Sequence, residues 1–149
     1  MTEQQKKEIA ALARSYEGVP YERGADPEKA GKLFDCSSFT EHLFSRIGIT
    51  LPRSSILQAA DPQGREIMPA KDYSDLEIGD LLFMRGVRGF YRDSLFDGRE
   101  LYIGHVALYL GDGSVIHSQA HTEPHGVRIE PLSVMTADPH YRIVLVKRF

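Results

Sequence analysis

A single cysteine stands where a helix is expected to begin. Cys36 follows Asp35, an acidic residue that suits an N-cap, and the segment ends at Gly48. Unpaired N–H groups and the positive end of a helix dipole both favour a thiolate at this position. Lowering an ordinary thiol pKa of ~8.5 by two units corresponds to about 2.7 kcal/mol and makes most of the group nucleophilic. Cys36 is therefore a candidate nucleophile, with a buried core cysteine as the alternative.

Two histidines on consecutive predicted strands supply a candidate base. His105 opens the segment 105–110, and His117 lies in the segment 114–118, across a glycine-containing turn. An imidazole that reaches a thiol at a helix start is the Cys–His arrangement of nucleophilic catalysis, in which a third polar group orients the ring. The chain contains no asparagine, so His117 is the nearest suitable third group. The alternative for each histidine is a hydrogen-bonded, half-buried strand residue.

Two further patterns indicate other functions less strongly. His117, His121 and His125 recur every four residues, a spacing that would form a metal-binding face on a helix. Pro124 and the strand-like residues before it argue against that helix. Arginines within 85–92 resemble a nucleic-acid patch, but the acidic residues that follow them, Asp93, Asp97 and Glu100, favour a solvated loop.

Composition limits the class of protein. The 149 residues, 42% hydrophobic and 26% charged, predict one globular domain over 1–149. The net charge of −3 argues against nucleic acid or anionic membrane as a partner, and no apolar run approaches the ~18–20 residues of a spanning helix. The single cysteine excludes an internal disulfide and a cysteine-based zinc cluster.

The sequence leaves localisation and oligomeric state open. The N-terminal segment is polar and lacks the apolar core of a signal peptide. That is compatible with a cytoplasmic protein, with a leader that has been removed, or with delivery by a dedicated system. Nothing in the sequence indicates an oligomeric state.

Helices are expected first and strands later. The predicted elements are a helix from a Thr2–Gln5 capping box to Gly18, helices over 35–48 and 54–60, and strands over 80–84, 105–110, 114–118 and 143–147. This order favours an α+β fold, with N-terminal helices packed on a small antiparallel sheet.

The span 85–102 has no clear hydrophobic period, and we expect it to form an exposed, mobile wall of the cleft. Its removal should change substrate preference more than stability.

Parity predicts the register of the hairpin that carries both histidines. Side chains alternate along a strand, so His117 shares the face of His105 only if it pairs with an odd-numbered residue. A two-residue Asp-Gly turn would place His117 on the wrong face. A three-residue loop at 111–113, with Gly113 left-handed, pairs His117 with Ala107 and brings the two rings within hydrogen-bonding reach. We therefore expect the three-residue loop.

Five sequence blocks together resemble the NlpC/P60 cysteine peptidases in order and spacing. They are DCSSF at 35–39, LPRS at 51–54, GDLLF at 79–83, GHVALYLG at 104–111 and VIHS at 115–118. The resemblance runs from about Tyr16 to the C-terminus. It implies a reduced papain-like α+β fold and hydrolysis of amide bonds in bacterial cell-wall peptides, commonly between D-γ-glutamate and a diamino acid. It implies no metal and no cofactor.

The resemblance also implies a role for each site residue. Cys36 corresponds to the nucleophile, His105 to the base and His117 to the residue that orients it. Tyr21, in the Y-x-x-G block at 21–24, corresponds to a tyrosine of the oxyanion site. The last two positions, Asp35 and Ser37, correspond to residues that contact the free N-terminal amine of the substrate in relatives specific for short peptides.

Departures from the family pattern affect substrate specificity more than chemistry. Ser38 and Ala25 stand where the family usually has glycine, the loop from Tyr21 to Cys36 is longer, and 85–102 is an insertion just before the base. Three alternative functions remain compatible with these residues. The first is a thiol acyltransferase or amidase acting on a non-wall substrate, and the second is a catalytically silent binding module. The third is a toxin or lysin that uses the same chemistry on a competitor's wall.

Overall fold

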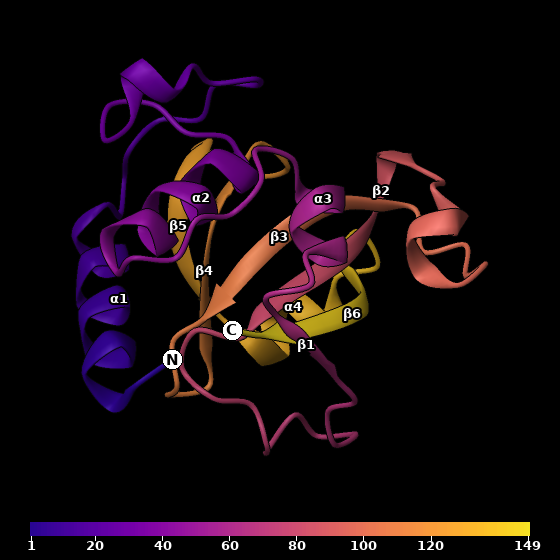
Figure 1. Cartoon of the computed structure of the whole chain (residues 1–149). Helices are drawn as coiled ribbons and strands as arrows, with labels where there is room; N and C mark the ends of the chain where they lie inside the picture. The colour runs from indigo at the N-terminus through magenta and orange to yellow at the C-terminus, as the bar shows by residue number, and fades with distance from the viewer.

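Six antiparallel strands form one sheet in the computed structural model, which describes residues 1–149. The strands follow the order β1-β6-β2-β3-β4-β5 (Figure 1). The elements are α1 (Glu3–Ser15), η1 (Pro27–Lys29), α2 (Cys36–Arg46), α3 (Ser55–Ala60), β1 (Arg65–Ile67), β2 (Leu81–Phe90), η2 (Asp93–Phe96), β3 (Ile103–Tyr109), β4 (Ser114–Gln119), β5 (Gly126–Pro131), α4 (Leu132–Ala137) and β6 (Arg142–Arg148). The predicted α+β class with an antiparallel sheet is confirmed.

Both long helices begin at the side-chain caps that the sequence predicts. Thr2 and Gln5 exchange capping hydrogen bonds at the start of α1. Asp35 and Ser38 form the same reciprocal pair at the start of α2, which makes Cys36 the first residue of that helix. The capping pair gives Ser38 a function at a position where the family usually has glycine.

Alternation along the strands gives the sheet two apolar faces. On β3, Val106 and Leu108 belong to the larger core, which also contains buried residues of α1, α2 and α3. Ala107 and Tyr109 belong to a smaller core with Leu132 of α4. The three N-terminal helices therefore cover one face of the sheet and α4 covers the other (Figure 1).

The β3–β4 hairpin has the predicted register. Leu108 pairs with Ile116, which fixes a three-residue loop over 111–113 with its last glycine at φ +77°. The same register places His117 across from β3 on the face that carries His105. The parity argument is therefore confirmed.

Part of the segment that was expected to be a loop between β2 and β3 pairs with the sheet or packs in the core. The strand β2 continues to Phe90 instead of ending near Met84, and its extension pairs with Ile103 of β3. The η2 turn then buries Phe96, which is 4% exposed, in the larger core. The prediction that 85–102 is exposed is confirmed for most of its residues, and part of the segment lines a cleft. The expectation that it is a loop without its own structure is wrong, because β2 extends into it and Phe96 anchors it.

Besides the two short 3-10 turns η1 and η2, three elements were not predicted, namely β1, β5 and α4. Of these three, β1 and β5 are short strands at opposite edges of the sheet, and α4 has only six residues. No helix of this chain combines the length and apolar character that crossing a bilayer requires.

Candidate active site

The start of α2 presents Cys36 to a cleft. The thiol is partly accessible, and it lines the cleft as the first residue of the helix. The backbone N–H groups of Ser37, on the helix, and Val106, on β3, act to lower the pKa of the thiol. The prediction that Cys36 stands at a helix start is confirmed.

The cleft has a volume of about 350 Å³ and brings together three of the predicted site residues, Tyr21, Cys36 and His105. The remaining lining residues are Arg23, Arg85, Gly86, Val87, Arg88, Gly104, Gln119, Ala120, His121, His140 and Tyr141. No hydrogen bond joins the thiol to His105. The two residues line the same cleft. Candidate catalytic hydrogen bonds are often long before a substrate binds.

A chain of side chains extends from His105 into the protein. Its Nε2 lies 2.8 Å from Nδ1 of His117, which is fully buried. On the far side, Nε2 of His117 lies 2.7 Å from Oε1 of Glu130, at ion-pair distance but without the angle of a good hydrogen bond. His117 therefore contacts His105 as the sequence predicts, and it has a carboxylate behind it.

Sequence reasoning missed Glu130 because it missed the strand that carries it. Residues 127–130 of β5 read Val-Arg-Ile-Glu, an alternation of apolar and charged side chains that is typical of a half-buried strand. That alternation was the available signal. The strand pairs with β4 so that Glu130 lies diagonally across from His117.

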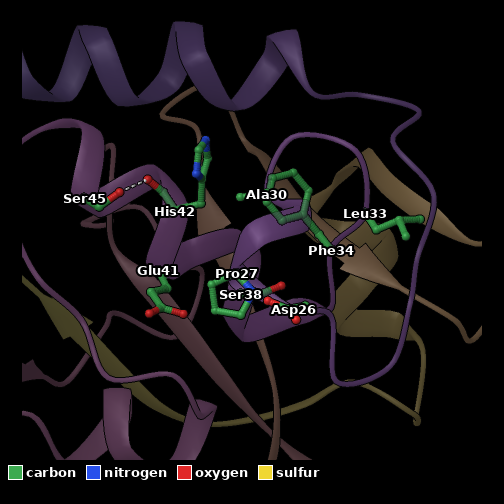
Figure 2. A pocket seen from close by; sticks show the side chains of 9 residues that line it. All are labelled: Asp26, Pro27, Ala30, Leu33, Phe34, Ser38, Glu41, His42 and Ser45. Atoms are coloured by element: carbon green, nitrogen blue, oxygen red, sulfur yellow. Dashed lines mark hydrogen bonds between the residues drawn. The ribbon is translucent and has the colours of Figure 1, made fainter.

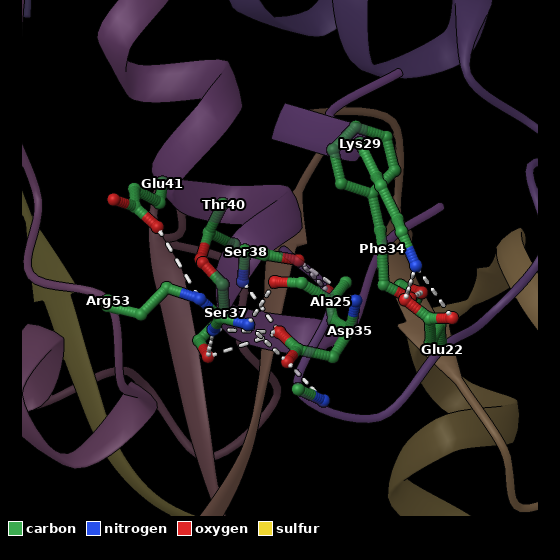
Figure 3. A network of polar contacts seen from close by, with 12 residues as sticks. Glu22, Ala25, Lys29, Phe34, Asp35, Ser37, Ser38, Thr40, Glu41 and Arg53 are labelled. Atoms are coloured by element: carbon green, nitrogen blue, oxygen red, sulfur yellow. Dashed lines mark hydrogen bonds and ion pairs between the residues drawn. The ribbon is translucent and has the colours of Figure 1, made fainter. Parts of the chain in front are cut away.

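Asp35 and Ser37 lie beside the nucleophile but do not line the cleft. Both are buried, and the guanidinium of Arg53 contacts both, with Nη1 at 3.0 Å from Asp35 Oδ1 and 3.0 Å from Ser37 Oγ (Figure 3). The second carboxylate oxygen of Asp35 accepts from Arg53 Nη2 at 2.6 Å and from the N–H of Gly24 at 3.0 Å. The oxygens that would bind a substrate amine are therefore engaged within the protein.

The same network controls the charge of Asp35. Burial alone would raise the pKa of this carboxyl, but hydrogen bonds from Arg53 and the backbone N–H of Ser38 outweigh it and lower the pKa below its ordinary value. Asp35 is therefore ionised at neutral pH, with its negative charge adjacent to Cys36.

The environment of Cys36 opposes the predicted thiolate. Burial, followed by the charge of Asp35, raises the thiol pKa to about 11, and the N–H groups of Val106 and Ser37 offset this only in part. Burial and the neighbouring ring of His117 hold the pKa of His105 well below 6.5. The resting pair is therefore a neutral thiol and a neutral imidazole. The thiolate that the helix start favours is therefore not supported, because desolvation outweighs the helix terminus.

We expect Cys36 to react with iodoacetamide more slowly in the folded chain than in the unfolded chain at pH 7. With a pKa of about 11, the thiolate fraction at that pH is on the order of 10⁻⁴, against a few per cent for an ordinary thiol. The second-order rate constant should rise with pH throughout pH 6 to 9. It is measured by mass spectrometry of the native and the urea-unfolded protein. A rate that is already maximal at pH 6 would instead indicate a thiolate–imidazolium pair.

The other histidines do not form a helical metal-binding face. His117 lies on β4, and His121 and His125 lie in the bend before β5. His121 instead stacks on His140, with ring centroids 3.6 Å apart, and contacts Asp138 at 3.2 Å. Both stacked rings line the cleft. His140 is thus part of the cleft wall.

A second cavity of about 200 Å³ lies between η1 and the outer side of α2 (Figure 2). Its lining residues are Asp26, Pro27, Ala30, Leu33, Phe34, Ser38, Glu41, His42 and Ser45. The hydroxyls of Ser38 and Ser45 both bond to backbone carbonyls, and Nε2 of His42 lies 2.8 Å from the hydroxyl of Tyr16. The cavity therefore lacks a nucleophile paired with a base.

A thiol at a helix start that shares a cleft with a strand-borne, oriented imidazole defines the cysteine peptidase class of site. The model of the NlpC/P60 family matches residues 18–146, which is most of the chain. The chain belongs to the NlpC/P60 family.

Individual relatives agree with this assignment. A probable endopeptidase of Corynebacterium glutamicum is 35% identical over 116 residues, which cover 78% of this chain and 44% of that protein. A gamma-D-glutamyl-L-lysine dipeptidyl-peptidase of Bacillus cereus is 35% identical over 111 residues, covering 74% and 28% respectively. The crystal structure of an NlpC/P60 family protein from Bacillus cereus matches with a TM-score of 0.68 at 28% identity, over 97% of this chain and 39% of that one. This chain thus spans less than half the length of these three relatives.

Proposed function

We propose that this chain hydrolyses amide bonds in peptidoglycan-derived peptides, with the γ-D-glutamyl–diamino acid bond as its target. The observation that carries the proposal is the single cleft that holds Cys36, His105 and Tyr21. The name of the Bacillus cereus relative, a gamma-D-glutamyl-L-lysine dipeptidyl-peptidase, supports the choice of bond. Membership of the family supports the reaction class.

The partly buried carboxylate of Glu130 sets the tautomers of the two histidines. Glu130 favours a proton on Nε2 of His117, which leaves a lone pair on its Nδ1. That lone pair accepts the Nε2 proton of His105, so Nδ1 of His105 carries the free lone pair. His105 is neutral at pH 7 and can therefore act as a base without first losing a proton.

The reaction then proceeds by general-base activation of the thiol. His105 removes the proton of Cys36 as the sulfur attacks the amide carbonyl, and Tyr21 with backbone N–H groups at the helix start stabilises the oxyanion. The C–N bond breaks as His105 returns that proton to the leaving amine. Water then attacks the thioester with His105 again as base, which releases the acid and regenerates the thiol. In this scheme Asp35 and Ser37, engaged by Arg53, hold the helix start in place.

The residues that line the cleft support two of the alternative functions, a transferase or amidase and a silent binding module, less well. A transferase or amidase for an apolar acyl group would be favoured by an apolar wall from 85–102, whereas that segment contributes Arg85 and Arg88. A silent binding module would be favoured by an unreactive thiol. The raised pKa of Cys36 alone does not indicate one, because a neutral His105 can deprotonate the thiol during attack.

Incubation with a muropeptide mixture tests the proposal. Mass spectrometry should show products cut after γ-D-glutamate, and the Cys36→Ala variant should show none. Products cut at another amide bond would replace the proposed bond, and intact muropeptides with the wild-type protein would contradict the proposed reaction.

We expect Glu130→Ala to lower kcat about 10–100-fold with little change in KM, by analogy with the loss seen when a carboxylate behind a metal-bound histidine is removed. Glu130→Gln should recover part of the rate, because an amide oxygen can still accept the Nε2 proton. Burial lowers the pKa of His117 and the carboxylate counteracts this, so loss of the carboxylate should lower the pKa further and move the acidic limb of the kcat profile to lower pH. The measurement is kcat between pH 4 and 8.

Glu123→Gln serves as the control for Glu130, because its side chain is 81% exposed and pairs only with His125. This change should leave kcat and the pH profile unchanged. A merely structural role for Glu130 would lower stability without moving the acidic limb, and that result would remove Glu130 from the mechanism.

A further inference from the structure

The charge of the cleft differs from the charge of the chain. The protein carries a formal charge of −3, yet Arg23, Arg85 and Arg88 line the cleft and no aspartate or glutamate does. The second and third of these arginines lie on the extension of β2, within the insertion that departs from the family pattern. The insertion therefore adds positive charge next to Cys36.

Acidic side chains do not neutralise these arginines. The arginines that form ion pairs are Arg14, Arg53, Arg99 and Arg148. Arg88 makes neither an ion pair nor a side-chain hydrogen bond within the protein. An unpaired guanidinium that lines a concave site is a strong donor for an incoming anion.

Arg85 is held in one orientation. Its Nη2 donates to the Tyr91 hydroxyl at 2.7 Å and its Nη1 to the carbonyl of Glu100 at 3.1 Å. The guanidinium carbon also lies 5.5 Å from the ring centroids of both Tyr91 and Tyr102, which stack on each other. These contacts use two of its five N–H donors and leave the others for a ligand.

The positive wall reaches the reacting end of the cleft. Burial raises the pKa of the Tyr21 phenol, while the charges of Arg23 and Arg88 act in the opposite direction. Both guanidinium groups are therefore close enough to influence the residue assigned to the oxyanion site. A ligand group bound by Arg88 would lie near the scissile amide.

We propose that Arg85 and Arg88 recognise a free carboxylate next to the scissile amide, so that the cleft selects γ-D-glutamyl peptides over their α-carboxamide forms. This inference rests on the proposed function and adds a specificity determinant to it. A guanidinium matches a carboxylate with two parallel hydrogen bonds. A carboxamide in the same place has no charge, and its NH₂ group would face another donor, which leaves a polar group unpaired.

The test uses two peptides that differ only at the α-carbon substituent of the γ-linked D-glutamyl residue, carboxylate in one and carboxamide in the other. Wild-type kcat/KM should favour the carboxylate at least tenfold. Arg88→Gln should lose about tenfold on the carboxylate peptide and less than twofold on the carboxamide peptide. Arg92→Gln is the matched control, because Arg92 is exposed in the same segment and does not line the cleft. It should change neither value.

Binding to the Cys36→Ala variant separates this inference from the proposed function. Calorimetry should give tighter binding of the carboxylate peptide, with the preference lost when Arg88→Gln is added. Equal hydrolysis and equal binding of both peptides, or an equal loss on both in Arg88→Gln, would overturn the arginine assignment. If the wild-type enzyme cleaves neither peptide while Cys36→Ala still prefers the carboxylate, the proposed reaction fails and the recognition stands.

Discussion

Replacing Cys36 by serine is expected to lower kcat/KM by about 10⁴-fold or more while the fold is retained. Loss of a nucleophile in a hydrolase that depends on a positioned base removes almost all of the rate enhancement. A serine hydroxyl has a much higher pKa than a thiol, and burial holds the pKa of His105 well below 6.5, so His105 removes the serine proton far less readily than the thiol proton. The measurement is hydrolysis of a γ-D-glutamyl peptide followed by mass spectrometry, with circular dichroism as the check on folding.

A double variant, Cys36→Ser with His105→Ala, tests whether the two residues act as one catalytic unit. Residues that act as one unit in catalysis show strongly non-additive losses. Adding His105→Ala to Cys36→Ser should therefore cost little beyond the single change, whereas His105→Ala alone should already lose most activity. Turnover by Cys36→Ser close to that of the wild type would exclude Cys36 as the nucleophile. Multiplicative losses would show that the cysteine and the histidine act separately.

Local rules were sufficient to predict the parts of the site that depend on neighbours in the sequence. Asp35 caps α2 and thereby sets Cys36 at the helix start, because capping needs only a side chain and a backbone within the same turn. The position of His117 beside His105 followed from strand parity and one loop length. Both inferences use interactions that a short stretch of sequence contains.

Tertiary burial determined the features that were predicted incorrectly. The raised pKa of Cys36 comes first from desolvation and then from Asp35, and the extent of burial is invisible in a list of residues. The arginines of 85–92 looked like a solvated loop, because nothing in their local pattern shows that β2 continues and brings Arg85 and Arg88 to the cleft. Long-range packing supplies both effects.

Phe96 is expected to connect the insertion to the stability of the whole domain. Its ring is 4% exposed and belongs to the larger core, whereas its neighbour Leu95 is 41% exposed. Truncating a buried phenylalanine to alanine typically costs 3–5 kcal/mol, through lost burial and the cavity left behind. Phe96→Ala should therefore lower the free energy of unfolding by about that amount in urea denaturation.

A control variant, Leu95→Ala, and a kinetic measurement test whether Phe96 anchors the insertion. Leu95→Ala removes a similar apolar group from the same turn and should cost less than about 1 kcal/mol, because that residue is 41% exposed and lies outside the core. At a temperature where Phe96→Ala remains folded, its preference for carboxylate over carboxamide peptides should fall, because Arg85 and Arg88 lie on the strand that η2 follows. Deleting the insertion would combine both losses, so the expectation that deletion spares stability no longer holds. An equal, small effect of both alanine variants on unfolding would show that Phe96 does not anchor the segment, and the cleft wall would then owe its position to the pairing of β2 with β3 alone.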